Sequence, residues 1–134
     1  MHEYALAEAT VARAAEIARE RNIATVGEVV IGLGELQRVD RDAFEFGLEA
    51  NRRTEPLLET ARFVFVADPA SCTCRACGHQ WDLADSLQAL PEDDRESVHL
   101  LPEMVHLYVG CPACGSPDYA VVGGRGVSIV AVNA

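Results

Sequence analysis

The sequence has few positive charges and no long hydrophobic segment. Its 134 residues include 11 basic and 21 acidic side chains, which give a formal net charge of −10. A surface of this sign repels phosphate backbones and anionic lipids, so we expect neither nucleic acid nor a membrane surface as a partner. The longest apolar run, Val127 to Val132, is interrupted by Ser128 and falls well short of the roughly 20 residues that cross a bilayer.

The amino terminus lacks the basic and apolar regions of a signal peptide, because the chain begins Met1-His2-Glu3. We therefore predict a cytoplasmic protein. In that reducing compartment, its five cysteines are more typical of metal ligands or free thiols than of disulfides. The length suits one main core with a small satellite.

Hydrophobic spacing predicts two helices. From Tyr4 to about Arg21 apolar residues recur every three or four positions, which indicates an amphipathic helix. A second helix is expected from an N-cap at Asp40 to about Arg52. The apolar stripe of the first helix is expected to contain Tyr4, Ala7, Val11, Ala14, Ala15 and Ala18.

Segments rich in β-branched residues predict strands within 25–36, 62–66, 119–122 and 127–132. Composition changes at Ser71, and the stretch that follows holds all five cysteines and the only tryptophan. Because helices and strands must bury their faces together, we expect the final strand to return to the sheet of the first domain. The predicted domains of this α+β fold are residues 1–70 with 119–134, and an inserted module of residues 71–118.

The clearest chemical signal is a pair of CxxC motifs, Cys74/Cys77 and Cys111/Cys114, each followed by a glycine. The spacing lets both sulfurs of a pair converge on one tetrahedral ion, and the glycine permits the tight turn that this requires. Four thiolates suit structural zinc and leave no open coordination position. A thioredoxin-like redox motif is the competing interpretation, but it needs one pair near a βαβ unit.

Two features of this module depart from a simple zinc ribbon. The pairs are separated by 33 residues, against about 15–20 in a typical ribbon, so an insertion from about Asp82 to Met104 is expected to fold outward. Cys72 is left over, and we expect it to be a partly exposed free thiol rather than a ligand that exchanges onto the metal.

The first residues form a second candidate metal site. A bulky residue at position two favours retention of Met1, so the Met1 amine, the His2 backbone nitrogen and the His2 ring can chelate one ion. Three nearly coplanar nitrogens favour nickel(II) or copper(II) over zinc. A histidine at position two is usually incidental, so this motif alone is a weak signal. A zincin motif is excluded because Leu6 stands where HExxH needs histidine.

Taken together, Met1-His2-Glu3 before an amphipathic helix, the paired CxxC motifs and the Gly-Arg-Gly turn before the last strand resemble the HypA family. The resemblance covers essentially the whole chain and implies a nickel metallochaperone of nickel–iron hydrogenase maturation. It implies a nickel-binding domain with a small three-stranded sheet and two helices, joined to a four-cysteine, zinc-ribbon-like domain. Implied partners are a HypB-type nickel GTPase and the hydrogenase large subunit, with urease maturation proteins as further candidates.

The resemblance also implies a ligand set. The nickel motif falls on Met1, His2 and Glu3, and the zinc cysteines are the four of the paired motifs. The long insertion is similar to that of archaeal-type members, in which a histidine corresponding to His99 helps to complete the nickel site. His99 could equally be a packed core histidine beside Leu100 and Leu101, and Glu3 could hydrogen-bond a ligand instead of binding.

Two further histidines, His79 and His106, lie outside this set. His106 is more typical of a packed residue than of a ligand. His79 is expected to shape the zinc loop.

Two functions of other classes stay open. One is a zinc-ribbon adaptor that binds a protein partner and has no nickel role. The other is a metal-dependent hydrolase, which needs a general base and an open metal position that no clustered motif supplies. We therefore expect a carrier with nickel as cargo and zinc as a structural ion, and no enzymatic activity.

Overall fold

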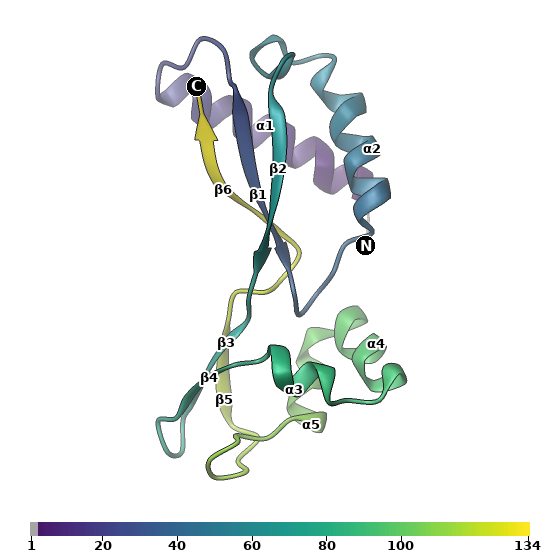
Figure 1. Cartoon of the computed structure of the whole chain (residues 1–134), viewed down its shortest axis with the longest axis vertical. Helices are drawn as coiled ribbons and strands as arrows, with labels where there is room; N and C mark the ends of the chain where they lie inside the picture. Colours follow the sequence, from purple (N-terminus) through teal and green to yellow (C-terminus); the bar gives the residue numbers. More distant parts are fainter. Residues whose placement is uncertain (1–2) are drawn as a thin grey trace. The chain divides into compact units, whose positions relative to one another are not determined.

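A computed structural model describes residues 3–134 as two compact units, each built from segments distant in sequence (Figure 1). The first unit contains the residues up to Leu33, Val39–Val66 and Val127–Ala134. The second unit contains Gly34–Arg38 and Ala67–Gly126. The chain therefore passes between the units several times, as expected for an inserted module.

The first unit contains a three-stranded sheet with strand order β2-β1-β6. Its strands are β1 (Glu28–Gly34), β2 (Arg62–Asp68) and β6 (Val127–Asn133). β6 runs antiparallel to β1, with a register shift between Val30 and Ile31. The expectation that the final strand returns to this sheet is confirmed.

Two helices pack on one face of this sheet, as Figure 1 shows. α1 (Glu3–Glu20) buries most of its expected stripe, but Tyr4 is 53% exposed. The prediction of a buried Tyr4 is wrong, because this residue lies in the first turn of α1, at the end of the stripe, and more than half of it stays open to solvent. A Cβ on Gly47 would lie 2.7 Å from the Cβ of Ala7, so glycine allows the two helices to approach closely.

The second helix, α2 (Arg41–Arg52), begins and ends where the sequence predicts. The Asp40 side chain accepts a hydrogen bond from the backbone N–H of Ala43 and thereby caps the helix. Phe44 and Leu48, four residues apart, are fully buried in the core between helices and sheet. A short 3-10 turn, η1 (Pro56–Leu58), then leads into β2.

The second unit has its own three-stranded sheet, with strand order β4-β3-β5. Its strands are β3 (Ser71–Cys74), β4 (Gln80–Asp82) and β5 (Tyr119–Val122). β5 pairs with β3 from Ser71↔Val122 to Cys74↔Tyr119, so residues 119–126 are part of this unit. The compact units therefore differ from the predicted domains in this segment, because β5 hydrogen-bonds to β3 and not to β6.

Between β4 and β5 the chain forms a small helical cluster. It consists of α3 (Ala84–Gln88), α4 (Glu92–Leu100), the 3-10 turn η2 (Pro102–Met104) and α5 (Val105–Tyr108). The insertion was expected to fold outward, but it supplies much of the second unit's core. It contributes the buried side chains of Leu83, Leu87 and Val98 to that core, and Val105 and Val109 of the next segment join them.

Cys72 is part of the same core and is only 2% exposed. The expectation of a partly exposed thiol is therefore wrong. Burial raises the pKa of the Cys72 thiol to about 11, with a smaller contribution from the negative charge of Asp82. This residue is a neutral hydrophobic side chain at physiological pH.

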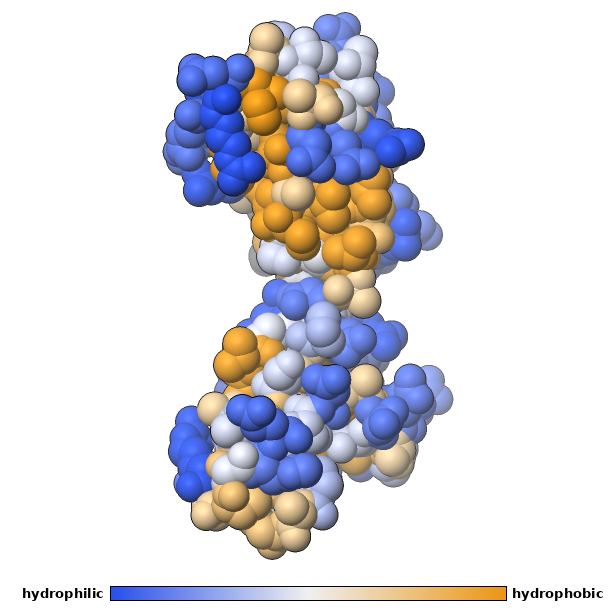
Figure 2. Space-filling model, turned by 60° about the vertical axis from the view of Figure 1, so that its left-hand side comes forward, coloured by the Kyte–Doolittle hydropathy of each residue, from blue (hydrophilic) through white to orange (hydrophobic). Residues whose placement is uncertain are grey.

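The surface of the first unit carries exposed hydrophobic residues, which Figure 2 shows as an orange area. Val66 and Val130, in the two outer strands of its sheet, are 40% and 61% exposed. Among the helices of residues 3–134, none is both long and apolar enough to span a membrane.

Candidate metal centres

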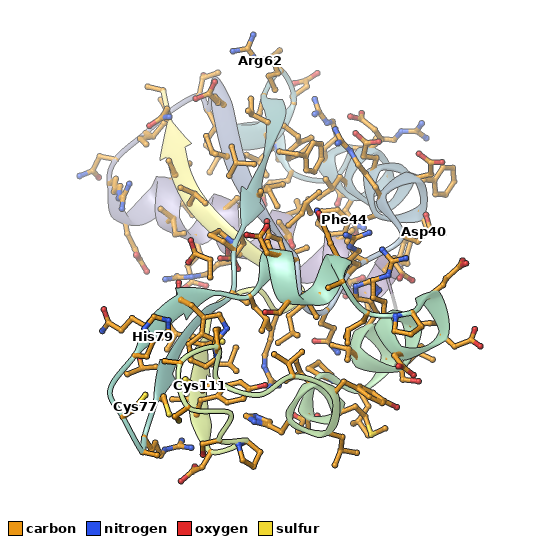
Figure 3. The ribbon with its side chains drawn as sticks, turned by 60° about the horizontal axis from the view of Figure 1, so that its bottom comes forward. Asp40, Phe44, Arg62, Cys77, His79 and Cys111 are labelled. Carbon is orange, nitrogen blue, oxygen red and sulfur yellow. The ribbon has the colours of Figure 1, made fainter. Side chains whose placement is uncertain are left out.

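The four paired cysteines converge at one end of the second unit's sheet. Their sulfur atoms all lie within 4.8 Å of one another, and Figure 3 shows Cys77 beside Cys111. The Sγ atoms of Cys74 and Cys114 are 3.6 Å apart, and those of Cys77 and Cys111 are 3.7 Å apart. Cys74 and Cys111 are buried, whereas Cys77 and Cys114 are exposed.

Both CxxC motifs form the same tight turn. Gly78 and Gly115 have φ of 76° and 79°, in the left-handed region that glycine adopts readily. In each turn the glycine N–H donates to the carbonyl of the first cysteine, over 2.9 Å to Cys74 and 2.7 Å to Cys111. The second cysteine of each pair is thereby brought back toward the first.

Backbone N–H groups point at the sulfurs. The N–H of Cys77 lowers the pKa of the Cys74 thiol to about 7, and the N–H of Ala76 acts in the same direction. The N–H groups of His79 and Ser116 act to lower the pKa of the Cys77 and Cys114 thiols, but burial and the neighbouring cysteines outweigh them and raise the pKa of both thiols above its ordinary value. These donors stabilise thiolates, which are the form of cysteine that binds a metal.

The sulfur geometry fits a tetrahedral metal ion. At a Zn–S bond of about 2.3 Å, tetrahedral ligands lie about 3.8 Å from one another. The two short sulfur separations, 3.6 and 3.7 Å, are close to this value. A four-sulfur set of this size suits zinc and leaves no position for a substrate.

The rings of His79 and His106 each contact an aromatic side chain, although His79 is exposed and His106 is half-buried. The His79 ring stacks on Trp81 with an interplanar angle of 13°, and its backbone carbonyl accepts from the Cys74 N–H. The His106 ring lies 4.4 Å from that of Tyr119, centroid to centroid, and its Nδ1 is 3.0 Å from the Pro117 carbonyl oxygen. These contacts agree with the expectations that His79 shapes the sulfur-binding loop and that His106 is a packed residue.

The structure describes only some of the residues that are predicted to bind nickel. Met1 and His2 lie outside the described residues. Glu3 is the first residue of α1, and its carboxylate accepts a hydrogen bond of 3.2 Å from the backbone N–H of Asp40. This bond ties the start of α1 to the N-cap of α2.

His99 lies in the last turn of α4 and is half-buried. Burial lowers the pKa of His99, as does the positive charge of Arg38, whereas the nearby Glu35 backbone acts in the opposite direction. The ring is therefore neutral at physiological pH. A neutral imidazole has one ring nitrogen with a free lone pair, which is the form of histidine that binds a metal.

Sequence reasoning missed the residues that support these sites. The thiolate donors of His79 and Ser116 follow each CxxC-Gly motif directly, so the repeated spacing could have identified them. The Glu35 carbonyl beside His99 has no sequence signal, because the two residues come from segments far apart in the chain.

Comparison with known proteins gives a full-length match. Residues 1–134 match the family model described as "Hydrogenase/urease nickel incorporation, metallochaperone, hypA". The hydrogenase maturation factor HypA of Pyrococcus abyssi is 40% identical over 99% of this chain and 95% of its own length. The protein of the same name from Pyrococcus horikoshii is 42% identical, with the same coverage.

The fold has solved counterparts as well. The solution structure of the nickel metallochaperone HypA from Helicobacter pylori covers 99% of this chain and 97% of its own, with a TM-score of 0.67. A second HypA solution structure gives a TM-score of 0.65. Each is 20% identical to this chain, so these likenesses concern the fold alone.

Proposed function

This chain belongs to the HypA family, and we propose that it binds Ni(II) at its N-terminus and delivers the ion for nickel–iron hydrogenase maturation. The observation that carries the proposal is the family match over residues 1–134, in a chain that begins Met1-His2-Glu3. The net charge of −10 favours attraction of a divalent cation.

The proposed nickel ligands are the Met1 amine, the backbone and ring nitrogens of His2, Glu3 and His99. The nitrogen donors at the terminus suit the square-planar preference of nickel(II). The lowered pKa of the half-buried His99 ring, which favours the neutral imidazole, supports its role as a further ligand. The hydrogen bond between Glu3 and the Asp40 N–H supports a positioning role for Glu3 while nickel is absent.

In this proposal the four cysteines hold a structural Zn(II). The sulfur separations and the backbone donors support that assignment. The zinc keeps the sheet of the second unit together, whereas the nickel is cargo that must be released. The protein then acts as a carrier and not as an enzyme.

Membership of the family suggests which partners take part in nickel delivery and in which compartment it takes place. We propose a HypB-type nickel GTPase and the hydrogenase large subunit as partners in the cytoplasm, with urease maturation proteins as further candidates. Release follows if docking of a partner displaces a ligand from the terminal chelate. Binding must displace the proton of the amine, whose ordinary pKa is about 7.7–8.0, so nickel affinity falls as the pH decreases.

The decisive experiment is a nickel titration of the untagged protein by calorimetry, because a tag would convert the amine into an amide. His2→Ala is expected to weaken binding by more than about 100-fold, since the loss of outer-shell partners alone costs about 10–100-fold. His99→Ala is expected to weaken it by about tenfold or more. His79→Ala is the control, because it removes an exposed imidazole from outside the proposed set.

Unchanged nickel affinity in His2→Ala would reject the terminal site. The adaptor hypothesis makes the opposite prediction, since a protein without a nickel role retains its full activity after this substitution. Hydrogenase maturation in a strain that carries only the variant distinguishes the two.

A further inference from the structure

One face of α4 is open to solvent and contains none of the proposed metal ligands. The opposite side of the helix packs into the core of the second unit through the buried Val98. The exposed positions 92, 96 and 100 are spaced by four and positions 93 and 100 by seven, so their side chains lie on one stripe of the helix. We call this stripe, together with the exposed leucine that follows the helix, the α4 surface. Its residues are Glu92, Asp93, Glu96, Leu100 and Leu101.

The acidic residues of the α4 surface are not neutralised by neighbouring arginines. α4 contains four acidic residues and a single arginine within nine residues. Elsewhere in the protein, exposed glutamates such as Glu16, Glu45 and Glu103 form ion pairs with arginines. Among residues 3–134, none of the ion pairs includes a side chain of α4. The α4 surface therefore keeps a negative charge that a basic partner can neutralise.

The stability of the helix itself accounts for only part of this charge. Acidic residues in the first turn, as at Glu92 and Asp93, interact favourably with the positive end of the helix dipole. Glu96 lies beyond the first turn, and it stands one turn from Glu92, where two like charges repel each other. This repulsion is relieved when a positive group binds beside the two carboxylates.

The α4 surface also has an apolar end. Leu100 and Leu101 are 74% and 54% exposed, although leucine is among the residue types most often buried. Leu100 lies one turn beyond Glu96 on the same stripe, so the acidic and the apolar parts of the surface follow one another along the helix. This order suits a partner surface on which apolar and basic side chains follow one another in the same way.

From these features we propose that the α4 surface docks a basic amphipathic helix of a partner protein. Such a helix presents apolar side chains at every third or fourth position, and these pack on Leu100 and Leu101. Its lysines or arginines lie against Glu92 and Glu96. The free carboxylates decide this occupant, because they repel an anionic membrane and a second copy of this acidic chain. The proposal goes beyond nickel binding and is tested without that metal.

The test uses a fluorescein-labelled peptide of three Leu-Lys-Ala-Leu-Lys-Lys-Ala heptads, whose anisotropy is followed as the full-length, zinc-loaded protein is added. The wild type is expected to bind in the micromolar range, and more weakly as salt increases. A peptide with the same composition in scrambled order has the same charge but no apolar stripe. It is expected to bind about tenfold more weakly or less, because it cannot bury the leucines of the α4 surface.

Two double variants separate the charged part of the α4 surface from the apolar part. Glu92→Gln combined with Glu96→Gln is expected to weaken binding by about fivefold or more, because two exposed ion pairs are lost. Leu100→Ser combined with Leu101→Ser is expected to weaken it by about tenfold or more. Zinc content and Trp81 fluorescence verify that both variants are folded.

The first unit supplies a matched control for each variant. Glu8→Gln combined with Glu59→Gln removes two exposed glutamates that belong to none of the ion pairs among residues 3–134. Phe46→Ser combined with Val130→Ser removes two exposed apolar side chains. Both controls are expected to bind as the wild type does.

Four results would each overturn the proposal. They are wild-type affinity in either α4 variant, equal weakening in the matching control, equal binding of the scrambled peptide, and no wild-type binding up to about 1 mM.

Discussion

The two units of this protein gain their stability in different ways. The first unit packs two helices of 18 and 12 residues against a sheet and buries a continuous hydrophobic core. The second unit has strands of only three or four residues and helices of at most nine. Short elements bury little apolar surface, and domains of this kind commonly rely on a bound metal. We therefore expect the second unit to depend on a metal ion held by its four cysteines in addition to its own small core, whereas the first unit depends on side-chain packing alone.

Removal of the metal is expected to produce the largest difference in stability between the two units. Chelation, or Cys114→Ser, should disorder the β4-β3-β5 sheet, because structural zinc in small domains contributes about 10–16 kcal/mol of apparent binding free energy. Trp81 is the only tryptophan and lies in β4, so its fluorescence reports on the second unit alone. We expect its emission to shift to longer wavelength while the helical circular dichroism of the first unit persists.

Cys72→Ala is the control for this experiment. It removes the buried Cys72 of β3 from the core and leaves the four-sulfur cluster intact, so one metal ion per chain should remain. If chelation removes the metal and Trp81 emission does not change, the cluster is not what holds the second unit together.

Truncation of the first unit's core should have the converse effect. Phe44→Ala is expected to lower the free energy of unfolding of that unit by about 3–5 kcal/mol, because Phe44 is fully buried and contacts Phe65 edge to face. Urea unfolding followed by far-ultraviolet circular dichroism measures this loss. Metal content and Trp81 emission should stay at wild-type values.

Phe46→Ala makes the same chemical change on the same helix at a position that is 73% exposed. We expect it to alter stability by less than about 0.5 kcal/mol. Similar losses for the two phenylalanines would contradict the assignment of the core to the Phe44 face of α2.

The smallest expected effect concerns the cap of α2. Asp40→Ala should destabilise the first unit by about 1 kcal/mol, because it removes the hydrogen bond to the Ala43 N–H. Asp40→Asn should cost only a few tenths of that amount, since asparagine caps equally well. The same urea titration measures both variants, and an equally large loss in Asp40→Asn would show that charge and not capping is responsible.

Local features of the fold could be predicted from residues close together in the sequence. The α2 boundaries follow from the Asp40 cap and from the four-residue spacing of Phe44 and Leu48, which act within one or two helical turns. The CxxC-Gly turns are equally local, since each is closed by hydrogen bonds within six residues. The burial of Cys72 could also have been predicted, because residues two apart on a strand share a face and Cys74 is buried on that face.

Other features depended on contacts between distant segments. The strand character of 119–122 was predicted, but its pairing with β3 is a choice among partners that no local pattern encodes. The burial of the insertion against Tyr119 and the position of His99 beside Glu35 have the same origin.

The sequence by itself determined the two long helices α1 and α2, the return of the last strand, the four-sulfur set and membership of the HypA family, but not the short helices α3, α4 and α5 of the insertion. Periodicity, caps and cysteine spacing act over a few residues and can be read along the chain. Only the tertiary structure decided which sheet receives β5, how the insertion forms a core and which face of α4 is left open to solvent. These outcomes depend on the packing of segments that lie tens of residues apart, where side-chain volume and hydrogen-bond partners compete across the whole chain.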